Sequence, residues 1–175
     1  TLLAKDSGGG SFDEVFSIPW WKVEDAYPDC PLGFGCISAT VELRGRADVS
    51  DDLGARDASA LYRFLVRRDF LSDRIPAEPQ ALIADATHLT ACGHLRAPAG
   101  GMIAYHVGLG QHVEKGQHCA DIIDPMADPA VARTPVLAPT SGRLFTMKTS
   151  KLCRPGQSIG KIAGVAALRP DGGYM

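Results

Sequence analysis

Residues 97–101, APAGG, return as residues 138–142, APTSG, and this repeat decides the fold of the second half of the chain. A second match follows in each copy, because residues 116–117 and 156–157 both read GQ. Each unit has roughly forty residues, too few to bury its own apolar face, so the units must cover one another. We therefore predict that they pack about a pseudo-twofold axis, as a small all-β unit over residues 91–165.

A helix is predicted upstream of the repeat, over residues 51–68. Ser50 is a suitable N-cap, the aspartates at 51–52 place negative charge in the first turn, and the arginines at 67–68 place positive charge in the last. Apolar side chains fall near one face of this helix, at Leu53, Ala60, Leu61, Phe64 and Leu65. We expect that face to lie against a sheet.

Residues 34–45, FGCISATVELRG, precede the helix and predict a strand. Apolar and polar residues alternate from residue 37 to 43, the period that gives a strand one apolar and one polar face. Glu42 lies on the polar face near the carboxyl end of this strand, where open α/β sheets place their ligand crevices. Two interpretations stay open: Glu42 is a proton shuttle, or it is a solvated or salt-bridged glutamate at a strand end.

The 175 residues have the composition of a globular protein, with 45% hydrophobic and 22% charged residues. A net charge of −2 and the lack of a dense Lys/Arg run argue against nucleic acid and anionic membrane as partners. No apolar stretch approaches the length that spans a bilayer. The five cysteines are odd in number and form no C-x-x-C pair, which argues against a disulfide framework and favours a reducing, cytoplasmic compartment.

Two parts of the sequence resemble known families. The order APxxG, VEKGQ, APxxG and RPGQ looks like the barrel-sandwich hybrid of biotinyl and lipoyl domains. Residues 38–45, SATVELRG, stand before a helix and then such a barrel. That order resembles the carboxy-terminal part of the succinylglutamate desuccinylase/aspartoacylase family, whose catalytic domain is similar to zinc carboxypeptidases. Together the two resemblances cover nearly the whole chain.

The resemblance implies an α+β fold in three parts. Residues 1–80 would be the terminal strand and helix of an α/β, zinc-carboxypeptidase-like catalytic domain, and residues 81–166 an all-β barrel-sandwich hybrid domain. Residues 167–175 would be a tail. Within the first part, we expect Trp20 and Trp21 to be packing residues of a short strand or turn.

The family resemblance also implies a function. Such enzymes are zinc-dependent hydrolases that act on the linear amide bond of an N-acyl amino acid, such as N-succinylglutamate, N-acetylaspartate or N-acetyl-diaminobutyrate. Two His and one Glu hold the zinc and leave a site for water. The Glu of the TVE motif transfers the protons, and it corresponds to Glu42, which would be the general base and acid.

The sequence departs from the family at the metal. The family's zinc ligands lie on an H-x-x-E segment and a later His in the amino-terminal half, and here all five histidines follow residue 68 and none has Glu at the third position after it. We therefore expect a fragment that lacks the zinc ligands and hydrolyses nothing by itself. His106, His112 and His118 recur every six residues, but we expect ordinary surface histidines on separate turns or strands, and no metal site.

Arg44 and the β unit leave alternatives open. Arg44 could bind a substrate carboxylate through a forked pair of hydrogen bonds, or pair with Asp48 at the surface. A biotin or lipoate carrier needs a lysine between its half-repeats, and residues 124–134, DPMADPAVART, contain none, so we expect neither cofactor. A non-catalytic lipoyl/biotinyl-like module, acting as scaffold or binding domain, is the alternative function. Exposed apolar surface near Trp20 favours a homo-oligomer.

Overall fold

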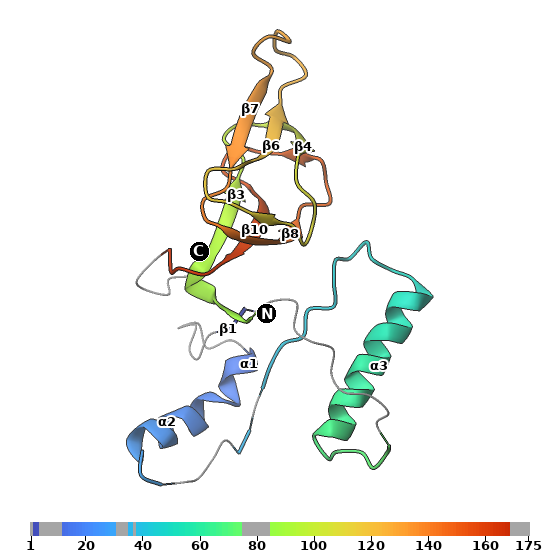
Figure 1. Ribbon diagram of the computed structural model, residues 1–175, viewed down its shortest axis with the longest axis vertical. Helices are drawn as coiled ribbons and strands as arrows, with labels where there is room; N and C mark the ends of the chain where they lie inside the picture. Colours follow the sequence, from blue (N-terminus) through green and yellow to red (C-terminus); the bar gives the residue numbers. More distant parts are fainter. Residues whose placement is uncertain (1, 4–11, 31–34, 37, 75–84, 169–175) are drawn as a thin grey trace.

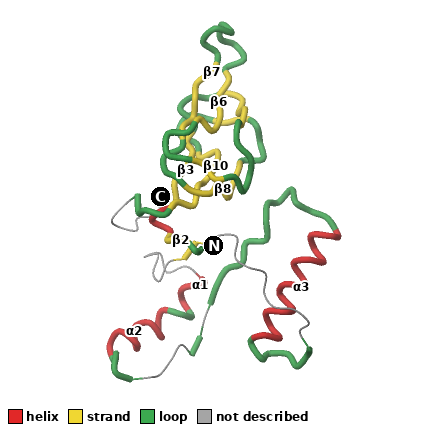
Figure 2. Tube along the Cα trace, in the orientation of Figure 1, coloured by secondary structure: helices red, strands yellow, loops and turns green. Residues whose placement is uncertain are grey.

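The computed structural model describes residues 2–3, 12–30, 35–36, 38–74 and 85–168 (Figure 1). Within these ranges, helices dominate the amino-terminal part of the chain and strands the carboxy-terminal part (Figure 2). The described residues therefore combine helices and strands, as the expected α+β class requires. None of the described helices is both long enough and apolar enough to cross a membrane.

Two four-stranded antiparallel sheets form a β domain. The first has the order β3-β10-β8-β5, with strands Cys92–Arg96, Ser158–Gly164, Gly142–Met147 and His112–Val113. The second has the order β7-β6-β4-β9, with strands Arg133–Leu137, His118–Ile123, Gly101–Tyr105 and Leu152–Cys153. A short parallel pair, β1 (Leu2–Leu3) and β2 (Thr87–His88), and the 3₁₀ turn η1 (Leu89–Ala91) precede them.

The order of the strands reproduces the internal repeat. Replacing β3, β4, β5 and β6 by β7, β8, β9 and β10 converts each sheet order into the other. Backbone hydrogen bonds repeat in the same way: the amide of Ala97 donates to the carbonyl of Gln157, the amide of Ala138 donates to that of Gln117, and both distances are 2.9 Å. The predicted pairing of two similar units is confirmed, and each unit contributes strands to both sheets.

One hydrophobic core lies between the two sheets. Its largest fully buried side chains include Leu95, Ile122, Leu144, Ile159 and Ile162. These side chains come from strands of both sheets, so neither sheet has a core of its own. Burying each such side chain stabilises a fold by about 1.5–3 kcal/mol, and this shared core holds the two half-repeats together.

The glycine that closes each APxxG motif is required by a close approach of two strands. A Cβ at Gly101 would lie 2.3 Å from the carbonyl oxygen of Ile123. A Cβ at Gly142 would lie 2.1 Å from the carbonyl oxygen of Ala163. Real side chains do not come this close to backbone, so only glycine lets β4 and β8 pair with β6 and β10 at these positions.

Three α-helices lie outside the β domain in the described ranges: α1 (Phe12–Val15), α2 (Ile18–Ala26) and α3 (Asp51–Arg67) (Figure 1). The predicted helix is confirmed as α3, because it begins at Asp51 and the Ser50 hydroxyl accepts a hydrogen bond from the amide of Leu53 at 3.3 Å. Its expected contact with a sheet is wrong. Leu61, Phe64 and Leu65 are 43%, 56% and 39% exposed.

The strand predicted over residues 34–45 is also wrong for the residues that the structure describes, which are 35–36 and 38–45. These residues form no strand, and Val41 and Leu43 are 62% and 53% exposed. A strand needs a neighbour to share its backbone hydrogen bonds; in this segment the amide of Ser38 donates instead to the side-chain hydroxyl of Ser17, at 3.0 Å. Residues 34 and 37 lie outside the described ranges.

Candidate functional site

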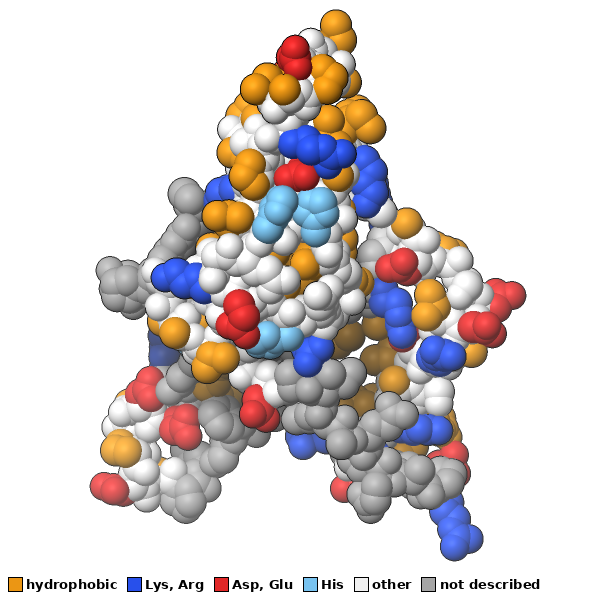
Figure 3. All heavy atoms as spheres, turned by 45° about the horizontal axis from the view of Figure 1, so that its top comes forward, with side chains coloured by type: hydrophobic (Ala, Val, Ile, Leu, Met, Phe, Trp, Pro, Cys, Tyr) orange, Lys and Arg blue, Asp and Glu red, His pale blue; other side chains and the backbone are white. Residues whose placement is uncertain are grey.

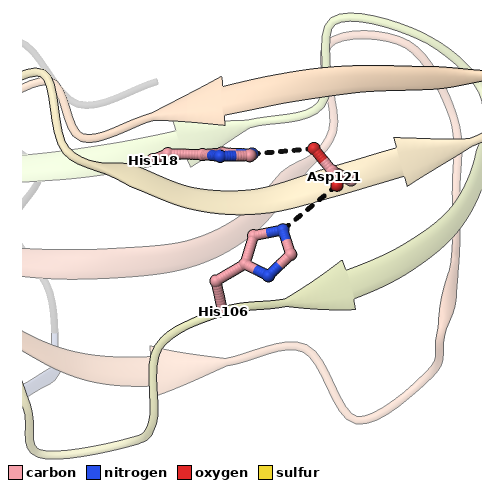
Figure 4. Close-up of side chains that lie close together, drawn as sticks. All are labelled: His106, His118 and Asp121. Carbon is pink, nitrogen blue, oxygen red and sulfur yellow. Dashed lines mark hydrogen bonds and ion pairs between the residues drawn. The ribbon is translucent and has the colours of Figure 1, made fainter.

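Two histidines and an aspartate meet on the second sheet of the β domain (Figure 4). Strand β6 carries His118 and Asp121, while His106 directly follows β4. Strands β4 and β6 are antiparallel neighbours, and the amide of His106 donates to the carbonyl of Cys119 at 2.9 Å. Pairing of these two strands therefore places His106 beside His118.

A β-bulge turns His118 toward Asp121. Residues three apart in a regular strand point to opposite faces. The register of β6 against β7 shifts between His118 and Ala120, and such a bulge re-aims the side chains next to it. As a result, both side chains reach the same face of the sheet.

The three side chains are in direct contact. The Nε2 atom of His118 lies 2.7 Å from Oδ1 of Asp121, and the Nε2 atom of His106 lies 3.1 Å from Oδ2. The two imidazole rings have centroids 4.6 Å apart. Arg133 donates a third hydrogen bond to Oδ2 of Asp121 at 3.0 Å. Asp121 is thus the centre of the group, and both of its oxygens are engaged.

Burial and charge differ within the group. The side chain of Asp121 is 9% exposed, whereas those of His106 and His118 are 40% and 47% exposed. Burial acts to raise the pKa of Asp121, but hydrogen bonds from Arg133, His118 and His106 outweigh it and keep the pKa below its usual value. The site therefore presents a fixed anion beneath two accessible imidazoles.

The sequence predicts that His106, His112 and His118 lie on separate turns or strands, and this is confirmed. His112 lies on β5, where its Nδ1 atom is 3.5 Å from Oε1 of Glu114. The structure nevertheless brings His106 and His118 together with Asp121, a grouping that the sequence reasoning missed. The available signal was the His118-x-x-Asp121 spacing, but reading it required knowledge of the bulge.

Glu42 and Arg44 lie elsewhere in the chain, on the exposed segment before α3. No hydrogen bond or ion pair joins Glu42 to another described residue. Arg44 pairs with Asp57 of α3, while Asp48 accepts a hydrogen bond from the amide of Gly45 at 2.9 Å. Arg44 also has a φ of 60°, an uncommon value for a residue other than glycine.

The sequence matches no protein-family model and no curated protein. Solved structures do match its fold. A succinylglutamate desuccinylase/aspartoacylase family protein from Shewanella amazonensis has a TM-score of 0.76 and 21% identity, over 89% of this chain and 43% of that chain. The corresponding protein from Shewanella frigidimarina has a TM-score of 0.72 and 20% identity, over 89% and 42%.

The ectoine utilization protein EutE from Ruegeria pomeroyi is also similar, with a TM-score of 0.56 and 17% identity. That likeness covers 71% of this chain and 37% of that chain. The chain thus spans less than half the length of the solved structures that it matches. Its fold is that of a part of the succinylglutamate desuccinylase/aspartoacylase proteins.

Proposed function

We propose that this chain is part of a zinc-dependent hydrolase that cleaves the linear amide bond of an N-acyl amino acid. The observation that carries the proposal is the order of three elements along the chain, which is the order that the family resemblance predicts. The SATVELRG segment, α3 and the β domain follow one another, and family proteins match this fold over 89% of the chain. We take the β domain to be the barrel-sandwich hybrid that the repeat resembles.

The substrate class follows from the same resemblance. N-succinylglutamate, N-acetylaspartate and N-acetyl-diaminobutyrate are the candidates. The names of the similar structures support this class, since they refer to succinylglutamate, to aspartoacylase and to ectoine utilization. The acyl group itself is left open, because no described residue of this chain selects among the three.

Glu42 is the proposed general base and acid of the reaction. A carboxylate in this role takes a proton from the attacking water and later gives a proton to the leaving nitrogen. The exposure of Glu42 supports the role, since no described side chain occupies its oxygens. Arg44, two residues on, is a weaker candidate for binding the substrate carboxylate, because Asp57 already engages it.

The zinc of such a hydrolase would have to be held outside this chain. No H-x-x-E segment occurs in the sequence. Among the described residues, one group of side chains could hold a metal ion, and it consists of His106, His118 and Asp121. This group belongs to the β domain, whereas Glu42 precedes α3. The residues around Glu42 thus do not fit the family's zinc site, and the chain alone is expected to be inactive.

Exposed apolar side chains support a missing neighbour. The extended segment exposes Val41 and Leu43, and α3 exposes Leu61, Phe64 and Leu65. Apolar surface of this extent normally marks an interface. We propose that the remainder of the catalytic domain covers it, and that the complete protein is a cytoplasmic homo-oligomer.

The β domain is proposed to carry neither biotin nor lipoate. A carrier lysine must stand at the connection between the half-repeats, and that connection, residues 124–134, contains no lysine. A non-catalytic scaffold role is the second candidate function. It is favoured by the distribution of the core, because Val66 and Ala91 are the buried hydrophobic side chains that the described residues outside the two sheets and their connections contribute.

Substitution of Glu42 in the complete protein tests the proposal. Glu42→Gln should leave the zinc content unchanged and nearly abolish the release of free amino acid from its N-acyl substrate. Glu24→Gln, at another exposed glutamate, is the matched control and should retain full turnover. Full turnover by Glu42→Gln would remove Glu42 from the mechanism and leave the scaffold role for this chain.

A further inference from the structure

We infer that His106, His118 and Asp121 form a binding site for one divalent transition-metal ion, such as Zn²⁺, on the surface of the β domain. The inference does not depend on the proposed hydrolase function. It rests on the geometry of the three side chains, on their exposure and on a comparison of the two half-repeats.

The spacing of the donor atoms suits a common coordination sphere. Zinc bonds of 2.0–2.2 Å in a tetrahedral arrangement place neighbouring ligand atoms about 3.3 Å apart. The Nε2 atom of His106 already lies 3.1 Å from Asp121, and that of His118 lies 2.7 Å away. The three donor atoms all lie within 4.8 Å of one another. Small rotations of two exposed rings would bring all three onto one ion.

The surroundings of Asp121 resemble the support that metal ligands normally have. Ligating carboxylates are usually held by a hydrogen bond from a neighbouring residue. Arg133 supplies that bond to Oδ2 at 3.0 Å, and its side chain is 58% exposed. Arg133 therefore holds Asp121 in place, and a metal ion would replace the contacts between the carboxylate oxygens and the two imidazoles.

The fold itself does not require this cluster. In the register set by Gly116 and Gly156, His118 and Asp121 correspond to Ser158 and Lys161 of the second half-repeat. The bulge is kept there, since the register of β10 also shifts between Ser158 and Gly160. One unit thus forms the same strand and bulge without a carboxylate or imidazole at these positions.

The residue equivalent to His106 in the second half-repeat is Lys148. The amide of His106 donates to the carbonyl of Cys119 at 2.9 Å, and the amide of Lys148 donates to the carbonyl of Ile159, the equivalent of Cys119, at 2.8 Å. The residues at all three ligand positions therefore differ between the half-repeats, although the backbone hydrogen bonds are alike. This difference supports a metal site that belongs to the first half-repeat.

The donor set also selects the kind of ion. Two imidazoles and one carboxylate favour Zn²⁺, Co²⁺, Ni²⁺ or Cu²⁺ over Mg²⁺ and Ca²⁺, which prefer oxygen ligands. Three protein ligands leave at least one coordination position for water. Figure 3 shows two histidine side chains side by side at the surface, next to an acidic side chain, so an ion can reach the site from solvent.

Calorimetric titration of the metal-free chain with ZnCl₂ at neutral pH tests the inference. We expect one bound Zn²⁺ per chain, and an affinity at least tenfold weaker in His106→Gln and in His118→Gln, because loss of even a supporting residue costs 10–100-fold. His112→Gln is the matched control, since His112 lies on β5 outside the cluster, and it should bind as the wild type does. Absence of binding at 100 µM Zn²⁺ would overturn the inference, as would equal affinity in all four proteins.

A second measurement needs no substitution and so does not depend on the folding of a variant. Co²⁺ added to the wild-type chain should broaden the imidazole proton resonances of His106 and His118 first, and leave those of His112 sharp at one equivalent. Broadening of His112 at the same Co²⁺ concentration, with His106 and His118 unaffected, would place the metal elsewhere and refute the site.

Discussion

Replacing Gly142 with alanine should strongly destabilise the β domain. The new Cβ would lie 2.1 Å from the carbonyl oxygen of Ala163, 2.7 Å from its carbonyl carbon and 2.9 Å from the Cα of Gly164. All three atoms are backbone of β10, which pairs with β8 at this point, so no side chain can move aside. Overpacking costs about 1–3 kcal/mol, and because two paired strands must separate we expect the upper end, about 3 kcal/mol.

Thermal unfolding followed by circular dichroism measures this effect. A loss of 1 kcal/mol lowers the midpoint of a domain of 60–100 residues by about 4–8 °C, so Gly142→Ala should lower it by more than about 10 °C. Gly108→Ala is the matched control, because no atom lies within 4 Å of its added Cβ. Its free energy of unfolding should stay within about 0.5 kcal/mol of the wild type. Equal midpoints for the two variants would refute the close approach of the strands.

Three further outcomes follow from the core, the helix cap and the buried carboxylate. Leu144→Ala should lower the free energy of unfolding by about 2–5 kcal/mol, measured by urea denaturation, because Leu144 is fully buried; a loss below 1 kcal/mol would contradict its central place. Ser50→Ala should weaken α3 by about 1 kcal/mol and reduce the helical circular dichroism signal, whereas an unchanged signal would count against the cap. Asp121→Asn should be less stable than the wild type at pH 6. The folded protein keeps the pKa of Asp121 below that of the unfolded chain. The difference in free energy of unfolding between wild type and variant is therefore largest above the unfolded pKa of about 3.9, and it should shrink as the pH falls below that value. Urea titrations that give the same difference at pH 6 and pH 2.5 would contradict the pKa shift.

The β domain and α3 could be predicted because their signals are local or repeated. The paired APxxG motifs indicate that the two halves share one fold. The glycine of each motif is needed because the backbone of a neighbouring strand lies where a Cβ would be. Ser50, with two aspartates after it, marks the start of α3. The start of α3 can be read from adjacent residues, and the repeat can be read by comparing its two copies in the sequence.

The remainder depends on partners that the sequence does not identify. An alternating segment such as residues 37–43 becomes a strand only when a neighbour accepts its hydrogen bonds, and the described residues offer none. Trp20 and Trp21, expected in a strand or turn, lie in α2 instead, which has Pro19 in its first turn. The contact of His106 and His118 with Asp121 needed both the pairing of β4 with β6 and a bulge, and neither can be read from spacing.

The most direct test of the proposed function compares this chain with the complete protein that contains it. Each would be incubated with N-succinylglutamate, N-acetylaspartate and N-acetyl-diaminobutyrate, and the free amino acid released would be quantified. The complete, zinc-loaded protein should release amino acid from at least one of the three, and the chain alone from none. Release by the chain alone, or none by the zinc-loaded complete protein, would contradict the proposal that this chain supplies the proton-transfer residue of a deacylase whose metal is held elsewhere.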